Sequence, residues 1–275
     1  MKKILSLVLA LLMIASLAAC GNKGADKDLL AKIKEQGYIV LCTEPYFAPY
    51  EFIDPSKSGD EQYVGLDIEL AKCIADKLDV ELKIVPLDYT AVLAGIADGK
   101  YDFAVSAISY SPERAAAMNL SNVYLQDAGY GFIVRSEDAD KYTSLESLKD
   151  AIVITQSASV QEGLMNAQVT ECKETKLVAN MTDAYLAVAE GKADVCICSV
   201  KSATLYAEAN GGLTVPEFRL DVDPNMNGTV VALPKEGSDS LMAVINEVIT
   251  ELNADGTIIA WEEEYAAYAK SLGIE

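Results

Sequence analysis

The sequence contains no histidine among its 275 residues, and this absence narrows the chemistry available to it. Without imidazole, general acid–base catalysis would rest on other titratable side chains, and no acid stands out for that role beyond Glu44. Metal binding loses its commonest ligand, which leaves the Cys-x-Cys pair at Cys196 and Cys198 without a second pair at ligand spacing. We therefore predict no metal site, no cofactor and no enzymatic activity.

Basic residues are also scarce, since 22 lysines and arginines face 42 acidic residues and give a formal net charge of −20. A polyanion of this kind repels nucleic acid and anionic lipid headgroups, so neither is an expected partner. The overall charge says little about the charge of a ligand, because one arginine can dominate a pocket. We expect an acidic protein that functions as a monomer.

Long apolar runs are missing except at the N-terminus, where two lysines precede the uncharged stretch 4–19. This stretch is typical of a secretory signal and is short for a membrane span. Cys20 directly follows small residues and the local pattern resembles a bacterial lipobox. We predict a signal peptide over 1–19, a palmitate-bearing lipid anchor on Cys20 and a polar tether over 20–28. The alternative is an uncleaved anchor helix, and either arrangement predicts export to the outer face of the cytoplasmic membrane.

Five cysteines follow Cys20 in the sequence: Cys42, Cys73, Cys172, Cys196 and Cys198. An odd number cannot all pair within one chain. Cys42, Cys196 and Cys198 lie in apolar runs, where a free thiol behaves as a small hydrophobic group. The sequence therefore favours buried thiols, with a single disulfide that involves Cys172 as the open alternative.

The segment from Asp102 to Arg114 is the most informative part of the chain. A short apolar run ends there in the hydroxyls of Ser106 and Ser109, and an arginine follows one turn later. Strand-end hydroxyls, exposed backbone N–H groups and a guanidinium together form a cradle for a small anion. The chemistry indicates capture of a carboxylate.

Strand-like and helix-like segments alternate along the rest of the chain. The first set has strands over 38–42, 81–85 and 101–107 with helices over 65–78 and 89–99. The second has strands over 131–134, 151–154, 175–178 and 194–198, a helical turn over 144–150, and helices over 160–166 and 182–191. A strand over 229–233 and a helix over 238–254 return to the first set. Segments 95–102 and 187–194 both run from helix through a Gly-Lys turn into a strand. The pattern predicts two tandem α/β units with parallel strands.

Several motifs in order carry a family resemblance: 43–52, 64–71, 99–102 followed by 111–114, and 254–257. Together they resemble the family-3 solute-binding proteins of amino-acid ABC transporters, from about Leu29 to the C-terminus. The resemblance implies the type II periplasmic-binding-protein fold, an α/β fold of two lobes joined by two connecting segments. Lobe 1 would comprise 29–125 and 226–275, and lobe 2 would comprise 126–225.

The resemblance also implies the residues of the ligand site. Arg114 matches the family's carboxylate-binding arginine, helped by the hydroxyl and backbone groups around Ser106, Ala107 and Ser109 and by the second-lobe hydroxyl of Ser159. Phe47 and Tyr89 match the aromatic walls, and Glu44 matches a position, usually acidic, that touches the ligand's amino group or side chain. A flat aromatic wall can hold a ligand with little rotamer entropy to lose.

Ser199 departs from the family pattern. Many members have an aspartate at this position, and it binds the α-ammonium of the ligand. A serine can accept a hydrogen bond but cannot neutralise a buried cation. Either another acid, such as Glu44, Asp221 or Asp223, replaces it, or the ligand lacks a standard α-ammonium.

The leading functional hypothesis is a substrate-binding lipoprotein that closes on an amino acid or related carboxylate and delivers it to an ABC permease. A sensory lipoprotein that binds its ligand without transport is the first alternative. An enzyme that resembles cyclohexadienyl dehydratases, which share the fold, is the second.

Overall fold

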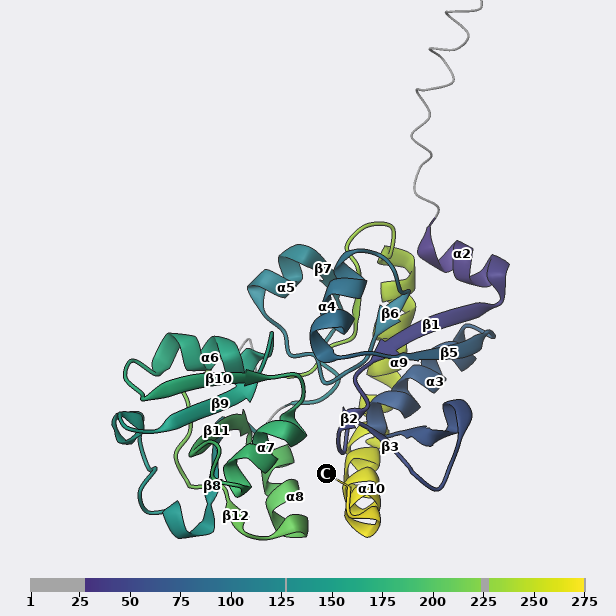
Figure 1. Cartoon of the computed structure of the whole chain (residues 1–275). Helices are drawn as coiled ribbons and strands as arrows, with labels where there is room; N and C mark the ends of the chain where they lie inside the picture. Colours follow the sequence, from purple (N-terminus) through teal and green to yellow (C-terminus); the bar gives the residue numbers. More distant parts are fainter. Residues whose placement is uncertain (1–27, 127, 224–227, 275) are drawn as a thin grey trace, which may run out of the picture.

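The computed structural model describes residues 28–126, 128–223 and 228–274, which form two α/β lobes (Figure 1). This arrangement confirms the predicted fold class. The predicted signal peptide and Cys20 lie outside the described residues. Within the described ranges, no helix combines the length and apolar character needed to cross a membrane.

The sheet of lobe 1 has the strand order β5-β1-β6-β13-β7. Its strands are β1 (Tyr38–Thr43), β5 (Glu81–Pro86), β6 (Phe103–Ala104), β7 (Met118–Leu120) and β13 (Ala232–Pro234). β1 pairs in parallel with β5 and β6, whereas β13 pairs antiparallel with β6 and β7. The chain therefore returns to this sheet after it has built lobe 2.

Six helices and a small sheet are built around the lobe 1 sheet. The helices are α2 (Leu29–Gln36), α3 (Leu66–Lys77), α4 (Tyr89–Ala97), α5 (Pro112–Ala117), α9 (Asp239–Ala254) and α10 (Thr257–Leu272). A short turn, η1 (Gly59–Gln62), precedes the last strand of the small antiparallel sheet of β2 (Tyr46–Phe47), β3 (Glu51–Ile53) and β4 (Tyr63–Val64). Leu66, Leu70 and Ile74 recur every four residues on α3, and all three are buried in the lobe 1 core.

Lobe 2 repeats this plan with the strand order β10-β9-β11-β8-β12. Its strands are β8 (Tyr130–Arg135), β9 (Ile152–Gln156), β10 (Glu174–Val178), β11 (Val195–Ser199) and β12 (Leu213–Thr214). Its helices are α6 (Val160–Gln168), α7 (Met181–Ala189) and α8 (Val200–Asn210), with short turns η2 (Ser136–Asp138) and η3 (Glu146–Leu148). β9 pairs in parallel with β10 and β11, and β8 runs antiparallel to β11.

The Gly-Lys repeat noted in the sequence has the same structural role in both lobes. Asp102 Oδ2 accepts a hydrogen bond of 2.9 Å from the backbone N–H of Val40, at the side of β1. Asp194 Oδ2 accepts an equivalent bond of 2.8 Å from the backbone N–H of Ile152, at the start of β9. Each aspartate therefore ties its own strand to the first parallel strand of its lobe.

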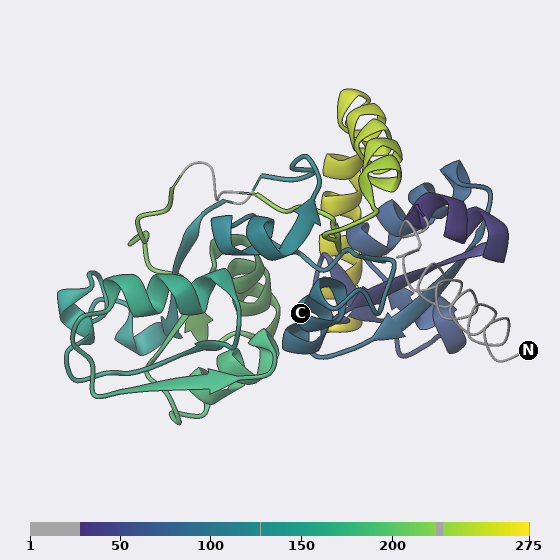
Figure 2. The same ribbon diagram turned by 90° about the horizontal axis from the view of Figure 1, so that it is seen from above.

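Two connecting segments join the lobes and lie side by side (Figure 2). The backbone N–H of Thr229 donates to the carbonyl of Leu125 at 2.8 Å, and the N–H of Tyr124 donates back to the carbonyl of Thr229 at 2.9 Å. Gly228 has φ +154, and a Cβ there would lie 2.5 Å from Val123 Cγ1. The close approach of the segments thus requires glycine at this position.

Two predicted strands are shorter than the sequence indicated. The strand predicted over 101–107 is limited to Phe103–Ala104, and Ala107, three residues later, has φ +44, which a strand does not allow. The strand predicted over 229–233 begins only at Ala232. Thr229 instead forms isolated β-bridges with Ser109 and with Leu125. Helices α2, α5, α8 and α10, strands β7 and β12 and the small sheet were not predicted.

All five described cysteines are free. Cys42, Cys196 and Cys198 are buried, as predicted, and burial raises the pKa of the Cys42 thiol to about 12. A disulfide through Cys172 is therefore absent from the structure. In the described part of the chain, no group of three or more metal-ligating side chains is assembled.

Candidate functional site

The predicted site residues gather where the strands of both lobes end. Glu44 follows β1 and Ser106 follows β6 in lobe 1, while Ser159 follows β9 and Ser199 ends β11 in lobe 2. Ligand sites in open α/β sheets lie at such carboxyl ends of strands. The boundary between the lobes (Figure 1) is therefore the candidate site.

Arg114 is buried at this boundary and contacts both lobes. Its Nη1 donates to the carbonyl of Ser109 at 2.6 Å, and its Nη2 donates to the carbonyl of Ala158 in lobe 2 at 2.9 Å. The sequence places it there because Ser111 caps α5 through the backbone N–H of Arg114, with Pro112 in the first turn. A groove of about 770 Å³ between α4, α5 and α6 opens beside the guanidinium.

Ser106 and Ala107 precede this arginine in the same segment, but they form hydrogen bonds with acidic side chains of lobe 1. The Ser106 hydroxyl donates to Glu51 Oε1 at 2.9 Å and accepts from the backbone N–H of Glu44 at 2.9 Å. The backbone N–H of Ala107 donates to Asp67 Oδ2 at 2.7 Å. Both groups predicted to receive a carboxylate are therefore engaged inside lobe 1 in this structure.

Ser109 is the hydroxyl of this segment that reaches lobe 2. Its Oγ lies 3.0 Å from the hydroxyl of Tyr130, the first residue of β8. Tyr130 is also paired in register with Ser199 at the end of β11. Ser109, Tyr130 and Ser199 thus form a buried polar group between the lobes.

The two predicted aromatic walls differ in their contacts. Phe47 stacks on Tyr50 with ring centroids 5.4 Å apart, and it packs against the apolar cores of both lobes. Tyr89 is buried, and the Arg114 guanidinium carbon lies 5.7 Å from its ring centroid. Phe47 therefore sits at the interface between the lobes, while Tyr89 supports the arginine through a cation–π contact.

Glu44 is buried at the same boundary, with 3% of its surface exposed. Its Oε2 accepts a hydrogen bond of 3.1 Å from Nε2 of Gln156 in lobe 2, and its Oε1 has no hydrogen-bond partner among the described atoms. Burial raises the pKa of Glu44 from 4.5 to about 8; the bond from Gln156 opposes this, and the charges of Asp88 and Asp183 add to it.

Gln156 was not identified as a site residue from the sequence. Its Nε2 bridges Glu44 Oε2 and the carbonyl of Ala179, the latter at 2.9 Å. The available signal was its position, since Gln156 ends the first parallel strand of lobe 2 just as Glu44 follows the first parallel strand of lobe 1.

Ser159 caps helix α6. Its hydroxyl donates to the carbonyl of Gln156 at 2.7 Å and accepts from the backbone N–H of Glu162 at 3.1 Å. The Glu162 carboxylate in turn accepts from the backbone N–H of Ala158 at 2.6 Å. This reciprocal capping fixes the loop that faces Arg114.

The acids near Ser199 in the sequence, and those considered as its replacement, lie in different environments. Asp194 lies at the other end of that strand, in an ion pair of 3.0 Å with Arg135. Asp221 is exposed, and its backbone N–H bonds to the side chain of Gln168. Of the acids considered from the sequence, Glu44 is the one that the structure buries at the boundary.

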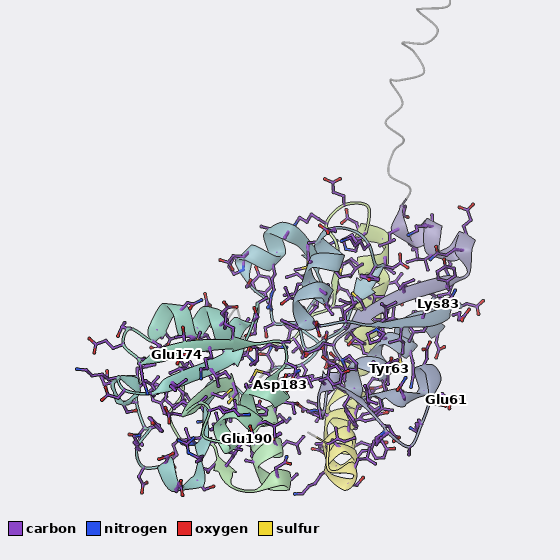
Figure 3. All side chains as sticks on the ribbon, in the orientation of Figure 1. Glu61, Tyr63, Lys83, Glu174, Asp183 and Glu190 are labelled. Atoms are coloured by element: carbon purple, nitrogen blue, oxygen red, sulfur yellow. The ribbon has the colours of Figure 1, made fainter. Side chains whose placement is uncertain are left out.

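Further contacts hold the lobes together beside the site. Thr182 of α7 donates to the carbonyl of Tyr46 at 3.4 Å, and Asp183 lies on the side of lobe 2 that faces lobe 1 (Figure 3). Farther along, Lys201 and Glu208 of α8 form ion pairs with Glu262 and Lys270 of α10. The lobes are therefore in direct contact around the site.

Comparisons with known proteins agree with this architecture. Residues 39–268 match the bacterial extracellular solute-binding proteins, family 3. An amino acid ABC transporter substrate-binding protein from Streptococcus pneumoniae, solved with L-arginine bound, is 33% identical with a TM-score of 0.81; the match covers 88% of this chain and 98% of that one. The arginine-binding extracellular protein ArtP of Bacillus subtilis is 25% identical over 262 residues, 94% of this chain and 95% of that protein. Cyclohexadienyl dehydratase of Pseudomonas aeruginosa is 26% identical over 203 residues, 73% of each chain. The chain belongs to the bacterial extracellular solute-binding proteins of family 3.

Proposed function

We propose that this protein is the amino-acid receptor of an ABC importer and that its lobes close on one solute molecule. The observation that carries the proposal is a pair of opposite side chains buried at the boundary. Arg114 and Glu44 both belong to lobe 1, and each bonds to lobe 2, through Ala158 and Gln156 respectively. An amino acid presents the complementary pair, a carboxylate and a cationic group.

The carboxylate would take the place of backbone carbonyls as the partner of Arg114. A planar guanidinium matches a carboxylate in two parallel bonds, and each such charge-assisted bond contributes about 1.5–3 kcal/mol. Ser109, Ser159 and Ser199 would line the same face, with Phe47 as the apolar wall. Ser106 and Ala107 would either keep their bonds to Glu51 and Asp67 and influence the ligand only indirectly, or exchange these bonds for bonds to the ligand.

The cationic group would lie against Glu44, whose Oε1 has no hydrogen-bond partner among the described atoms. L-Arginine is the first compound to test, because the two relatives named above as arginine-bound or arginine-binding cover nearly the whole chain. Binding favours lobe closure because part of the contacts with the solute form only in the closed state.

The proposed cellular context follows from the N-terminal sequence. Cleavage before Cys20 and lipidation of its sulfur would hold the receptor at the outer face of the cytoplasmic membrane, where it meets its permease. Detection of the lipid by mass spectrometry, and its loss in Cys20→Ala, tests the anchor. Co-purification with a permease separates the importer from a sensory lipoprotein.

Isothermal titration calorimetry with four compounds tests the ligand proposal. L-Arginine carries both charges and the guanidinium, L-citrulline lacks the guanidinium, argininic acid lacks the α-ammonium, and agmatine lacks the carboxylate. We expect arginine to bind, agmatine to bind far more weakly, and Arg114→Ala to remove the difference. The control Arg219→Ala alters an exposed arginine of lobe 2 and should change nothing. Equal affinities of wild type and Arg114→Ala would contradict the carboxylate site.

We further propose that the protein is not an enzyme, although one relative is a dehydratase. Dehydration needs a positioned acid and a base. Glu44, with its raised pKa, is a candidate acid, but the side chain that its carboxyl bonds to among the described residues is the amide of Gln156, which cannot act as a base. Release of water from a cyclohexadienyl acid by the purified protein, lost in Glu44→Gln, would overturn this assignment.

A further inference from the structure

Three carboxyl groups form a buried chain that runs from the site into lobe 1. Glu44, Glu51 and Asp67 are at most 3% exposed. Ser106 joins the first two, since its hydroxyl donates to Glu51 and accepts from the Glu44 backbone. Burial, and after it the charge of Asp67, raises the pKa of Glu51, and Asp67 Oδ1 accepts a hydrogen bond from the Tyr124 hydroxyl at 2.7 Å. We call these three residues the acid chain.

The acid chain has no basic partner in the described part of the protein. None of its carboxyls forms an ion pair with a lysine or arginine there. The groups that act electrostatically on Glu44 are Asp88 before α4, Asp183 on α7, Glu51 on β3 and Tyr89 on α4. Arg114 directs its guanidinium to two backbone carbonyls instead. Buried carboxyls without a cation are favoured in their neutral form.

Glu44 is the member of the acid chain that faces lobe 2. With its pKa raised to about 8, mainly by burial, it holds a proton at neutral pH. A cation placed against Oε1 would reverse this preference, because an opposite charge nearby favours the ionised carboxylate.

We propose that capture of a cationic group at Glu44 expels one proton, so that the site exchanges a proton for the solute's positive charge. The O–H bond of Glu44 breaks, the proton passes to the solvent, and an N–H of the solute donates to the carboxylate. The net charge of the buried site is unchanged by the exchange. The inference rests on the proposed function and adds to it a dependence of solute choice on pH.

The proton exchange predicts how strongly the affinity for the solute depends on pH. Below pH 8 the affinity for the cationic solute rises toward tenfold per pH unit, and roughly 50-fold between pH 6 and pH 8, because one proton is released per solute bound. A solute that leaves Glu44 protonated would bind with little change over the same range. The protein would therefore select cationic over uncharged side chains more strongly at higher pH.

Calorimetry of L-arginine in two buffers of different ionisation enthalpy, phosphate and Tris, tests the exchange at pH 7. The difference in heat gives the number of protons released, and we expect close to one for the wild-type protein. Glu44→Gln should bind with no proton released and with affinity independent of pH from 6 to 8. The control Glu174→Gln, which alters an exposed acid on the outer strand β10 of lobe 2, should retain the release.

The outcomes separate the two proposals. Arginine binding without proton release would overturn the exchange and leave the receptor function intact. If no amino acid binds at any pH, the receptor proposal fails and the exchange fails with it. Infrared difference spectra give a second readout: the carbonyl stretch of a protonated carboxyl should disappear when arginine binds, and Glu44→Gln should lack this change.

Discussion

The buried carboxyl of Glu44 should make this protein less stable as the pH rises from 5 to 8. The unfolded chain releases this proton near the ordinary pKa of 4.5, whereas the folded chain holds it until about 8. Between these values unfolding releases a proton, so each rise in pH favours the unfolded state. Above pH 8 both states have lost the proton, and this dependence ends.

The magnitude follows from the size of the pKa difference. The full difference for Glu44 corresponds to about 4–5 kcal/mol at 1.36 kcal/mol per pKa unit. Asp67, whose pKa is raised to about 6 mainly by burial, acts in the same direction up to that pH. Water that enters when the lobes separate shields Glu44, so we expect roughly 2–4 kcal/mol between pH 5 and 8. Asp194, whose pKa is lowered, has completed its opposite contribution by pH 5.

Urea unfolding at pH 5, 6, 7 and 8, followed by the fluorescence of the single tryptophan, Trp261, measures this dependence. Glu44→Gln places a neutral amide of similar shape at the boundary and should reduce the slope. The control Glu174→Gln, on the outer strand β10 of lobe 2 (Figure 3), should keep it. A free energy of unfolding that is constant or rises from pH 5 to 8 would refute the reasoning, as would an unchanged slope in Glu44→Gln.

Three further outcomes are expected. Asp102→Ala and Asp194→Ala should each lower the free energy of unfolding by about 1–3 kcal/mol in urea titrations, because each leaves a backbone N–H of the first parallel strand without its acceptor; a loss in only one lobe would contradict the equivalence of the repeats. Ser199→Asp should tighten arginine binding in calorimetry if the α-ammonium lies at the end of β11, and weaker or equal binding would place it elsewhere. Lys201→Met should destabilise the protein by about 1–2 kcal/mol, which is less than for a fully buried ion pair because Lys201 is 42% exposed. The double variant Lys201→Met with Glu262→Gln should recover part of this loss. No recovery would show that the two side chains act independently.

Local sequence was sufficient for most of the fold. Apolar residues at helical spacing identified α3, α4 and α9, and apolar runs identified most of the strands of both sheets. The errors lie where the backbone departs from the regular pattern, as in the predicted strand 101–107, where Ala107 has a positive φ. Helix α8 was missed because it follows β11 without an intervening turn, so no punctuation separates the two elements.

The site was predicted less completely than the fold. Arg114 and Glu44 were expected and lie at the lobe boundary, but Gln156 was missed because its role depends on a residue 112 positions away in the sequence. The hydroxyl of Ser106 and the N–H of Ala107 were expected to face a ligand. In the structure they bond to Glu51 and Asp67, acids that nothing in the local sequence marked as partners.

The sequence by itself determined the α/β class and the family, because periodicity and motif order are local properties of the chain. It also predicted a carboxylate-binding role for Arg114. Only the tertiary structure decided the charge state around that arginine, because burial and the distances between distant segments set the pKa of Glu44. The lack of an acid at Ser199 and Glu44 as one candidate replacement were visible in the sequence, whereas the burial of Glu44 against Gln156 of lobe 2 became apparent only in the tertiary structure.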